Sequence, residues 1–159
     1  MRLATRHSGW PARVLVAALA CLARTAAAEP GPDGSDDRDL HEFHEIRLAE
    51  RDEARPGDAR ALSLTIAPRP GYSISRKGPL IIDVAAEPGA GIEVPRQRYL
   101  RRHAADAHAD APRFDLRYRA VSAGHHALRV RLRFWVCGDA TCWPVRALRM
   151  VHIEVRSGS

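Results

Sequence analysis

Residues 126–136 alternate between apolar and polar side chains, the period of a β-strand with one buried face. The apolar positions are Leu128, Val130, Leu132, Phe134 and Val136, and those between them are Arg129, Arg131, Arg133 and Trp135. Residues 145–155 are rich in β-branched side chains and predict a returning strand. Between the two strands, Gly138-Asp139-Ala140-Thr141 provides the turn residues of a four-residue hairpin loop.

The hairpin register follows if Cys137 faces Cys142. The apolar face then pairs Phe134 with Val145, Leu132 with Ala147 and Leu128 with Val151, whereas the opposite face pairs Arg133 with Arg146 and Trp135 with Pro144, beside the cysteines. Arg149 would oppose Val130 on the apolar face, so we expect a β-bulge near residues 148–150.

The two cysteines are expected to lie on the outward face at the tip of this hairpin. Facing residues of an antiparallel pair are about 4.5–5.5 Å apart at Cα, which is within the range of a disulfide. Such a bond has two possible roles. It can be a structural staple worth about 2–3 kcal/mol in the loop-entropy description, or an accessible bond that undergoes exchange. A staple in an immunoglobulin sandwich more usually joins distant strands across the core.

The run FWVCGDATCWPV at residues 134–145, preceded by Gly71-Tyr72-Ser73-Ile74-Ser75-Arg76-Lys77, resembles the N-terminal periplasmic domain of the DsbD thiol:disulfide interchange proteins. The resemblance covers roughly residues 42–155. It implies an immunoglobulin-like sandwich whose cysteine pair passes electrons from a thioredoxin-like domain to periplasmic disulfide isomerases.

The chain departs from that family in several places. The family usually has two prolines after the second cysteine, where this chain has Trp143-Pro144-Val145. Ser73 and Ser75 replace aromatic residues, and no convincing match to the loop that caps the cysteines is present. We also expect the chain to lack the membrane and thioredoxin-like domains of the full-length family. The expected partners therefore act in trans: a thioredoxin-like or disulfide-isomerase protein and a DsbD-type membrane transporter.

The resemblance implies that Cys137 and Cys142 are the reactive pair and that Cys142 is the cysteine joined to the partner. The other expected site residues are Arg133 and Arg146, which would favour the thiolate; Trp135, Trp143 and Pro144, which would shield the sulfurs and contact a partner; and Tyr72, which would lie under the hairpin as in the family. The alternative for the tryptophans and for Tyr72 is ordinary packing. No cofactor is expected.

Residues 1–28 are typical of a secretory signal peptide. Three arginines precede an apolar segment at residues 14–23, and Ala26-Ala27-Ala28 provides a cleavage site. Ten apolar residues are too few to span a bilayer. A lipoprotein anchored through Cys21 is disfavoured because the leucine usual three residues before such a cysteine is absent. We therefore expect an exported, periplasmic protein without a membrane span, with a disordered acidic leader at residues 29–40.

The formal charge of +6 is unevenly distributed. Residues 29–60 contain 11 acidic and 5 basic residues, whereas residues 61–159 contain 8 acidic and 16 basic residues. Export and the lack of interleaved aromatic and basic residues argue against nucleic acid. The basic part of the chain then presents either a solvated face or a surface for an acidic partner.

The rest of the chain predicts short strands separated by turns. Strands are expected at residues 42–50, where a helix is the alternative, and at residues 59–67, 79–86, 92–94 and 114–120, with a short extended piece at residues 72–74. Residues 96–112 have no clear period. The eight histidines form loose pairs without the spacing of a closed metal site, so no metal is expected. The fold class is all-β: an immunoglobulin-like sandwich of about six to eight antiparallel strands over residues 41–156.

Overall fold

A computed structural model describes residues 42–157 of the chain. The signal peptide and the acidic leader predicted at residues 1–28 and 29–40 lie outside the described residues. The strands are β1 (His44–Arg47), β2 (Arg51–Ala54), β3 (Ala59–Pro68), β4 (Ser73–Ile74), β5 (Ile81–Ala86), β6 (Ile92–Glu93), β7 (Arg98–Leu100), β8 (Arg113–Ala120), β9 (Gly124–Cys137) and β10 (Cys142–Val155). One short 3-10 helix, Arg101–His103, follows β7.

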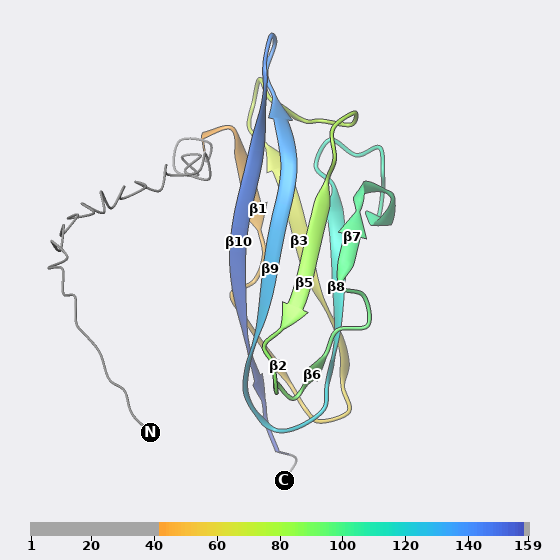
Figure 1. The fold of residues 1–159 in the computed structure, drawn as a ribbon, viewed down its shortest axis with the longest axis vertical. Helices are drawn as coiled ribbons and strands as arrows, with labels where there is room; N and C mark the ends of the chain where they lie inside the picture. The colour runs from red at the N-terminus through yellow and green to blue at the C-terminus, as the bar shows by residue number, and fades with distance from the viewer. Residues whose placement is uncertain (1–41, 158–159) are drawn as a thin grey trace, which may run out of the picture. The chain divides into compact units, whose positions relative to one another are not determined.

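The strands form two sheets, as predicted for an immunoglobulin-like β-sandwich (Figure 1). One sheet has the order β1-β3-β8-β6, and the other has the order β2-β10-β9-β5-β7, with β4 also paired to β9. The ten strands exceed the expected six to eight because five of them have four residues or fewer. No helix within residues 42–157 has the length and apolar character needed to cross a membrane.

The core lies between the sheets and follows the period-two pattern of the long strands. In β8 every second side chain is buried, and Phe114, Leu116 and Tyr118 are each 1% exposed. Leu64 of β3 and Ile82 of β5 contribute fully buried side chains from the two sheets. The alternation of the sequence therefore specifies the buried faces directly, because neighbouring residues of a strand point to opposite faces.

The β9–β10 hairpin has the predicted register. Fourteen consecutive pairs run from Cys137–Cys142 at the tip to Gly124–Val155, and they include Phe134 opposite Val145. The hairpin is the longest element of the sandwich, and its loop extends beyond the other strands (Figure 1).

The bulge predicted near residues 148–150 was wrong. Arg149 lies opposite Val130 with no inserted residue, and its side chain is only half-buried. Within the described residues, β2 pairs with β10 only at residues 152–155, so Arg149 lies at an open sheet edge. There its guanidinium turns back to donate a hydrogen bond to the Leu148 carbonyl at 2.9 Å. An edge position lets the charged end reach solvent without disturbing the ladder.

The strand predicted at residues 42–50 corresponds to β1, and a second strand that was not predicted, β2, follows at residues 51–54. β1 pairs antiparallel with β3 in one sheet, and β2 then joins the other sheet, where it pairs parallel with the end of β10. A hydrogen bond also links the sheets here, because the buried Tyr118 hydroxyl of β8 donates to Oδ2 of Asp52 of β2 at 2.7 Å. Arg60 donates to the other oxygen of Asp52 at 2.9 Å, so both carboxylate oxygens have partners.

Candidate functional site

Cys137, the last residue of β9, and Cys142, the first residue of β10, form a disulfide. Their Cα atoms are 4.0 Å apart, and five positions separate them in the sequence. The loop is closed by a hydrogen bond from the Gly138 amide to the Thr141 carbonyl at 2.9 Å. Because pairs alternate along an antiparallel ladder, the adjacent cysteine pair exchanges no backbone hydrogen bonds and has its side chains in close approach.

The two cysteines differ in exposure because β10 is an edge strand at the tip. Cys142 is exposed, and no strand of residues 42–157 pairs with its outer side. Cys137 is half-buried, since β4 runs beside it and pairs Ser73 with it. The Ser73 hydroxyl also donates to the Cys137 carbonyl at 3.4 Å. A nucleophile from solvent therefore meets Cys142 more readily than Cys137.

Pro144 lies on the outer face opposite Trp135, as predicted. This pair lies two positions from the cysteine pair, so it also exchanges no ladder hydrogen bonds. The Pro144 nitrogen consequently points toward the open edge of β10, where its missing N–H leaves no carbonyl of β9 without a donor. The edge position explains how β10 accommodates a proline so close to the tip.

Trp135 shares the outer face with Cys137 and Pro144. Its indole is half-buried because the segment after β4 packs on it: a Cβ added to Gly78 would lie 2.9 Å from the indole Cδ1. The Trp135 carbonyl accepts a hydrogen bond from the Ser75 amide at 2.9 Å, and the Gly78 amide donates to the Ser75 hydroxyl at 2.9 Å. Trp135 therefore lies next to the disulfide, as predicted, and packs against the segment around Gly78.

Trp143 lies on the opposite face of the hairpin from the sulfurs, because it pairs with the buried Val136. Its ring is 5.2 Å from that of Phe43, and Phe43 in turn stacks on Tyr72 at 4.6 Å. The expectation that Trp143 covers the sulfurs together with Trp135 is thus corrected: adjacent strand residues alternate in direction, and Trp143 follows Cys142.

Tyr72 lies under the hairpin, where it was expected. A Cβ added to Gly138 would lie 3.3 Å from its Cε1 atom, and its ring is 6.5 Å from that of Trp143. Phe43, Tyr72 and Trp143 form an aromatic cluster that supports the loop from the inner side. Phe43 was not predicted as a site residue, because its two ring partners lie 29 and 100 positions away in the sequence.

Arg133 is not adjacent to the disulfide, contrary to its predicted role with the thiolate. Four residues of extended chain place its Cα about 13 Å from that of Cys137. Its guanidinium instead donates to Asp83 of β5 at 3.1 Å, and Arg98 donates to the same carboxylate at 2.6 Å. These contacts, chiefly that with Arg98, hold the pKa of Asp83 below its ordinary value. Arg146 lies opposite Arg133 and is equally far from Cys142.

Arg101 is a site-supporting residue that sequence reasoning missed. Its Nη2 atom donates to the carbonyls of Ile74 and Ser75, both at 3.1 Å, while Nη1 reaches the Ala109 carbonyl at 3.4 Å. The guanidinium therefore fastens the segment that packs on Trp135 to the loop after the 3-10 helix. Residues 96–112 have no hydrophobic period, so the sequence held no pattern that would single out this arginine.

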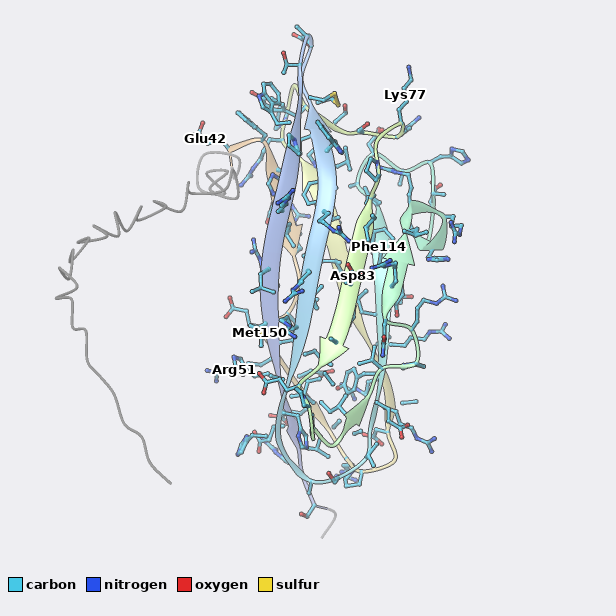
Figure 2. The ribbon with its side chains drawn as sticks, in the orientation of Figure 1. Glu42, Arg51, Lys77, Asp83, Phe114 and Met150 are labelled. Atoms are coloured by element: carbon cyan, nitrogen blue, oxygen red, sulfur yellow. A yellow bond between two sulfur atoms is a disulfide. The ribbon has the colours of Figure 1, made fainter. Side chains whose placement is uncertain are left out.

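Figure 2 shows Lys77 near the hairpin-tip end of the sandwich and Asp83 farther along β5. Within residues 42–157, no group of three or more histidine, cysteine, aspartate or glutamate side chains is arranged to hold a metal ion.

No family model matches the chain, and no curated protein matches it either. Among solved structures, AggA, the major subunit of aggregative adherence fimbriae type I from Escherichia coli, aligns at 7% identity and a TM-score of 0.35. That alignment covers 71% of this chain and 94% of AggA. Murine CRIg aligns at 9% identity and a TM-score of 0.34, covering 73% of this chain and 98% of CRIg. Likenesses this distant carry no functional argument.

Proposed function

We propose that the protein is a periplasmic thiol–disulfide exchange module that passes electrons through Cys137 and Cys142. The observation that carries the proposal is the cross-strand disulfide at the hairpin tip, with Cys142 exposed on an open edge. Exchange requires a thiolate to reach one sulfur along the axis of the bond, and an exposed cysteine at the tip of the hairpin favours such an approach.

The exchange proceeds in two displacements. A thiolate of a reduced partner attacks Sγ of Cys142, the bond between the two cysteines breaks, and Cys137 leaves as a thiolate that takes up a proton. The second thiol of the partner loses its proton and attacks the partner sulfur of the mixed disulfide. A disulfide then forms in the partner, and Cys142 leaves and is protonated. Two electrons enter the domain, and the reverse steps deliver them to an oxidised acceptor.

The competing role, a structural staple, is disfavoured by what the bond connects. It joins two ends of a loop that fourteen ladder pairs already hold together, and it links neither the two sheets nor distant parts of the chain. The loop-entropy description gives so short a closure about 2 kcal/mol. The disulfide therefore contributes little to the stability of the hairpin.

The partners proposed are a thioredoxin-like or disulfide-isomerase protein and a DsbD-type membrane transporter acting in trans. The disulfide supports an oxidising, exported location, since such bonds are rare in the reducing cytosol. The aromatic cluster and the segment on Trp135 would keep the hairpin tip in one conformation while a partner docks on it.

The test uses the full chain with Cys21→Ser, which leaves Cys137 and Cys142 as its cysteines. The oxidised protein is incubated with reduced thioredoxin, and free thiols are alkylated and counted by mass spectrometry. We expect two alkylated cysteines in the domain and one disulfide formed in thioredoxin. A bond that remains closed in the folded protein, even with a strong dithiol, would refute exchange and favour the staple.

A pair of single-cysteine variants tests the order of attack. Cys137→Ala leaves the exposed Cys142. Its thiolate should displace nitrothiobenzoate from a thioredoxin-like partner that has a single active-site cysteine, activated as the nitrothiobenzoate mixed disulfide, and so form a stable interprotein disulfide. Cys142→Ala leaves the half-buried Cys137 and should form it more slowly. Equal trapping rates for the two variants would contradict the assignment of Cys142 as the cysteine joined to the partner.

A further inference from the structure

The outer face of the β7-β5-β9-β10 sheet is rich in arginine. We define the arginine face by its five members, Arg98, Arg129, Arg131, Arg133 and Arg146. Their positions follow from the register: Arg129, Arg131 and Arg133 are successive outward residues of β9, Arg146 lies opposite Arg133, and Arg98 lies opposite Asp83. All five side chains are exposed.

The arginine face is only partly neutralised. Asp83 is its acidic member, and it accepts hydrogen bonds from Arg98 and Arg133. Within the described residues, no carboxylate lies within ion-pair distance of Arg129 or Arg131. Among the described residues, Arg98, Arg129, Arg131 and Arg133 thus have one carboxylate, Asp83, to offset their charge, and they face solvent from β7 and β9.

The arginine face also borders an exposed apolar side chain, as many protein contact surfaces do. Leu148, on the outward side of β10, is 51% exposed. It lines a shallow groove together with Arg131, Arg133 and Arg146. An exposed leucine bordered by arginines is typical of a docking surface, where an apolar contact is surrounded by charges that orient the partner.

The arginine face leads directly to the disulfide. Cys137, Trp135, Arg133, Arg131 and Arg129 are successive outward residues of one strand. At about 7 Å between successive outward positions, the arginines of β9 begin about 13 Å from Cys137 and end about 26 Å from it. When the reactive thiol of a partner protein contacts Cys142, the neighbouring surface of that partner would therefore cover these arginines.

We propose that the arginine face is the docking surface for an acidic polypeptide surface of the redox partner. The proposal rests on the proposed exchange function and specifies the partner chemistry of that same site. Steering by opposite charge raises the frequency of productive encounters by roughly 10- to 1,000-fold and weakens as salt is added.

The test compares two synthetic peptides, each with one reduced cysteine, followed in one by a run of glutamates and in the other by glutamines. In each case the peptide thiolate attacks Cys142, the disulfide breaks, and Cys137 is released as a protonated thiol. The rate of mixed-disulfide formation is measured with the full chain carrying Cys21→Ser. At about 0.05 M salt we expect the acidic peptide to react about ten-fold faster, and at about 0.5 M we expect this advantage to be largely lost.

Charge reversal assigns the effect to this face. Arg129→Glu with Arg131→Glu should remove most of the advantage of the acidic peptide and leave the rate with β-mercaptoethanol unchanged. The matched control is Arg117→Glu with Arg119→Glu, which changes the net charge equally on exposed positions of β8 in the other sheet. The control should retain the advantage to within about two-fold.

The possible failures are distinguishable. If no thiol opens the disulfide, the exchange function itself fails. If both peptides react equally, or if the two double variants behave alike, exchange stands and the docking proposal is overturned. Removal of residues 29–40, which contain five acidic residues, tests the chain's own acidic segment as the occupant. A faster reaction of the acidic peptide after this removal would assign the arginine face to that segment and overturn the proposal.

Discussion

At the scale of single residues, Tyr118 makes the stability of the fold depend on pH. Its phenol is buried between the sheets and donates to Asp52 at 2.7 Å. Burial first, and then the hydrogen bond to Asp52, raise the pKa of Tyr118 well above its ordinary value of 10.0. The folded state thus favours the neutral phenol, and this contribution to stability is present below about pH 10 and is lost as the pH rises further.

We expect Tyr118→Phe to lower the free energy of unfolding at pH 7 by about 1–2 kcal/mol, because Asp52 loses one hydrogen bond and keeps Arg60. The difference from the wild type should shrink above about pH 10, since only the wild type has this phenol to ionise on unfolding. Urea unfolding at a series of pH values measures it. A difference that stays constant up to about pH 11 would show that Tyr118 is not the group responsible.

Substitutions of the two tryptophans of the hairpin should have different effects, because Trp135 and Trp143 lie on opposite faces. Trp135→Ala uncovers the outward side next to Cys137 and should increase the rate of disulfide reduction by a small thiol several-fold. Trp143→Ala removes a ring from the aromatic cluster and should chiefly lower the free energy of unfolding, by about 2–3 kcal/mol. Reduction kinetics and denaturant unfolding are measured on both variants. Identical behaviour in the two assays would contradict the alternation of faces.

At the scale of the secondary-structure elements, β9 offers a test of the register. Leu132 is 1% exposed, and its neighbour Arg131 is exposed on the other face. Leu132→Ala should lower the free energy of unfolding by about 2–5 kcal/mol, as buried truncations do, whereas Arg131→Ala should stay within about 0.5 kcal/mol. Denaturant unfolding measures both. Equal losses would mean that the buried face is assigned wrongly.

The long hairpin was predictable from the sequence because residues close together in the chain determine its register. Strict alternation around Leu132 and Phe134 specifies the buried face, and the four-residue turn aligns Cys137 with Cys142. The bulge at Arg149 was predicted wrongly because the sequence does not show which strand is an edge. At an edge, a long charged side chain reaches solvent from an inward position.

The contacts that were not predictable join distant segments. The parallel pairing of β2 with β10 brings together residues about 100 positions apart and leaves no pattern in either strand. The ion pair of Arg133 with Asp83 and the hydrogen bonds of Arg101 depend on which strands become neighbours. Alternation placed Trp135, Arg133 and Arg146 on the outer face correctly, whereas the expected position of Trp143 beside the sulfurs was wrong. It also did not identify Asp83 as the partner of Arg133.

At the scale of the whole molecule, the fold should not depend on its disulfide. Removal of the bond by Cys137→Ala with Cys142→Ala should lower the free energy of unfolding by about 2 kcal/mol and leave the β-sheet circular dichroism spectrum unchanged. The reason is that the ladder pairs and the core between the sheets remain. A loss of folded structure in this variant would show that the bond is essential to the fold and would weaken the exchange proposal.

The core described here draws on residues from 54 to 155. We therefore expect removal of residues 1–40 to leave a folded, β-rich domain. Circular dichroism and denaturant unfolding of the truncated chain, compared with the chain that begins at Glu29, measure this. An unfolded truncated chain beside a folded longer one would show that the leader takes part in the fold.

The short separation of the two cysteines in the sequence also has a kinetic consequence. Ends of a flexible loop of about ten residues meet within roughly 10–100 ns, far faster than a sandwich with long-range strand pairing folds. Cys137 and Cys142 are closer than that along the chain. They encounter each other repeatedly in the unfolded polypeptide, so an oxidant can join them before any strand has paired. The protein can thus reach its folded state with the disulfide already formed.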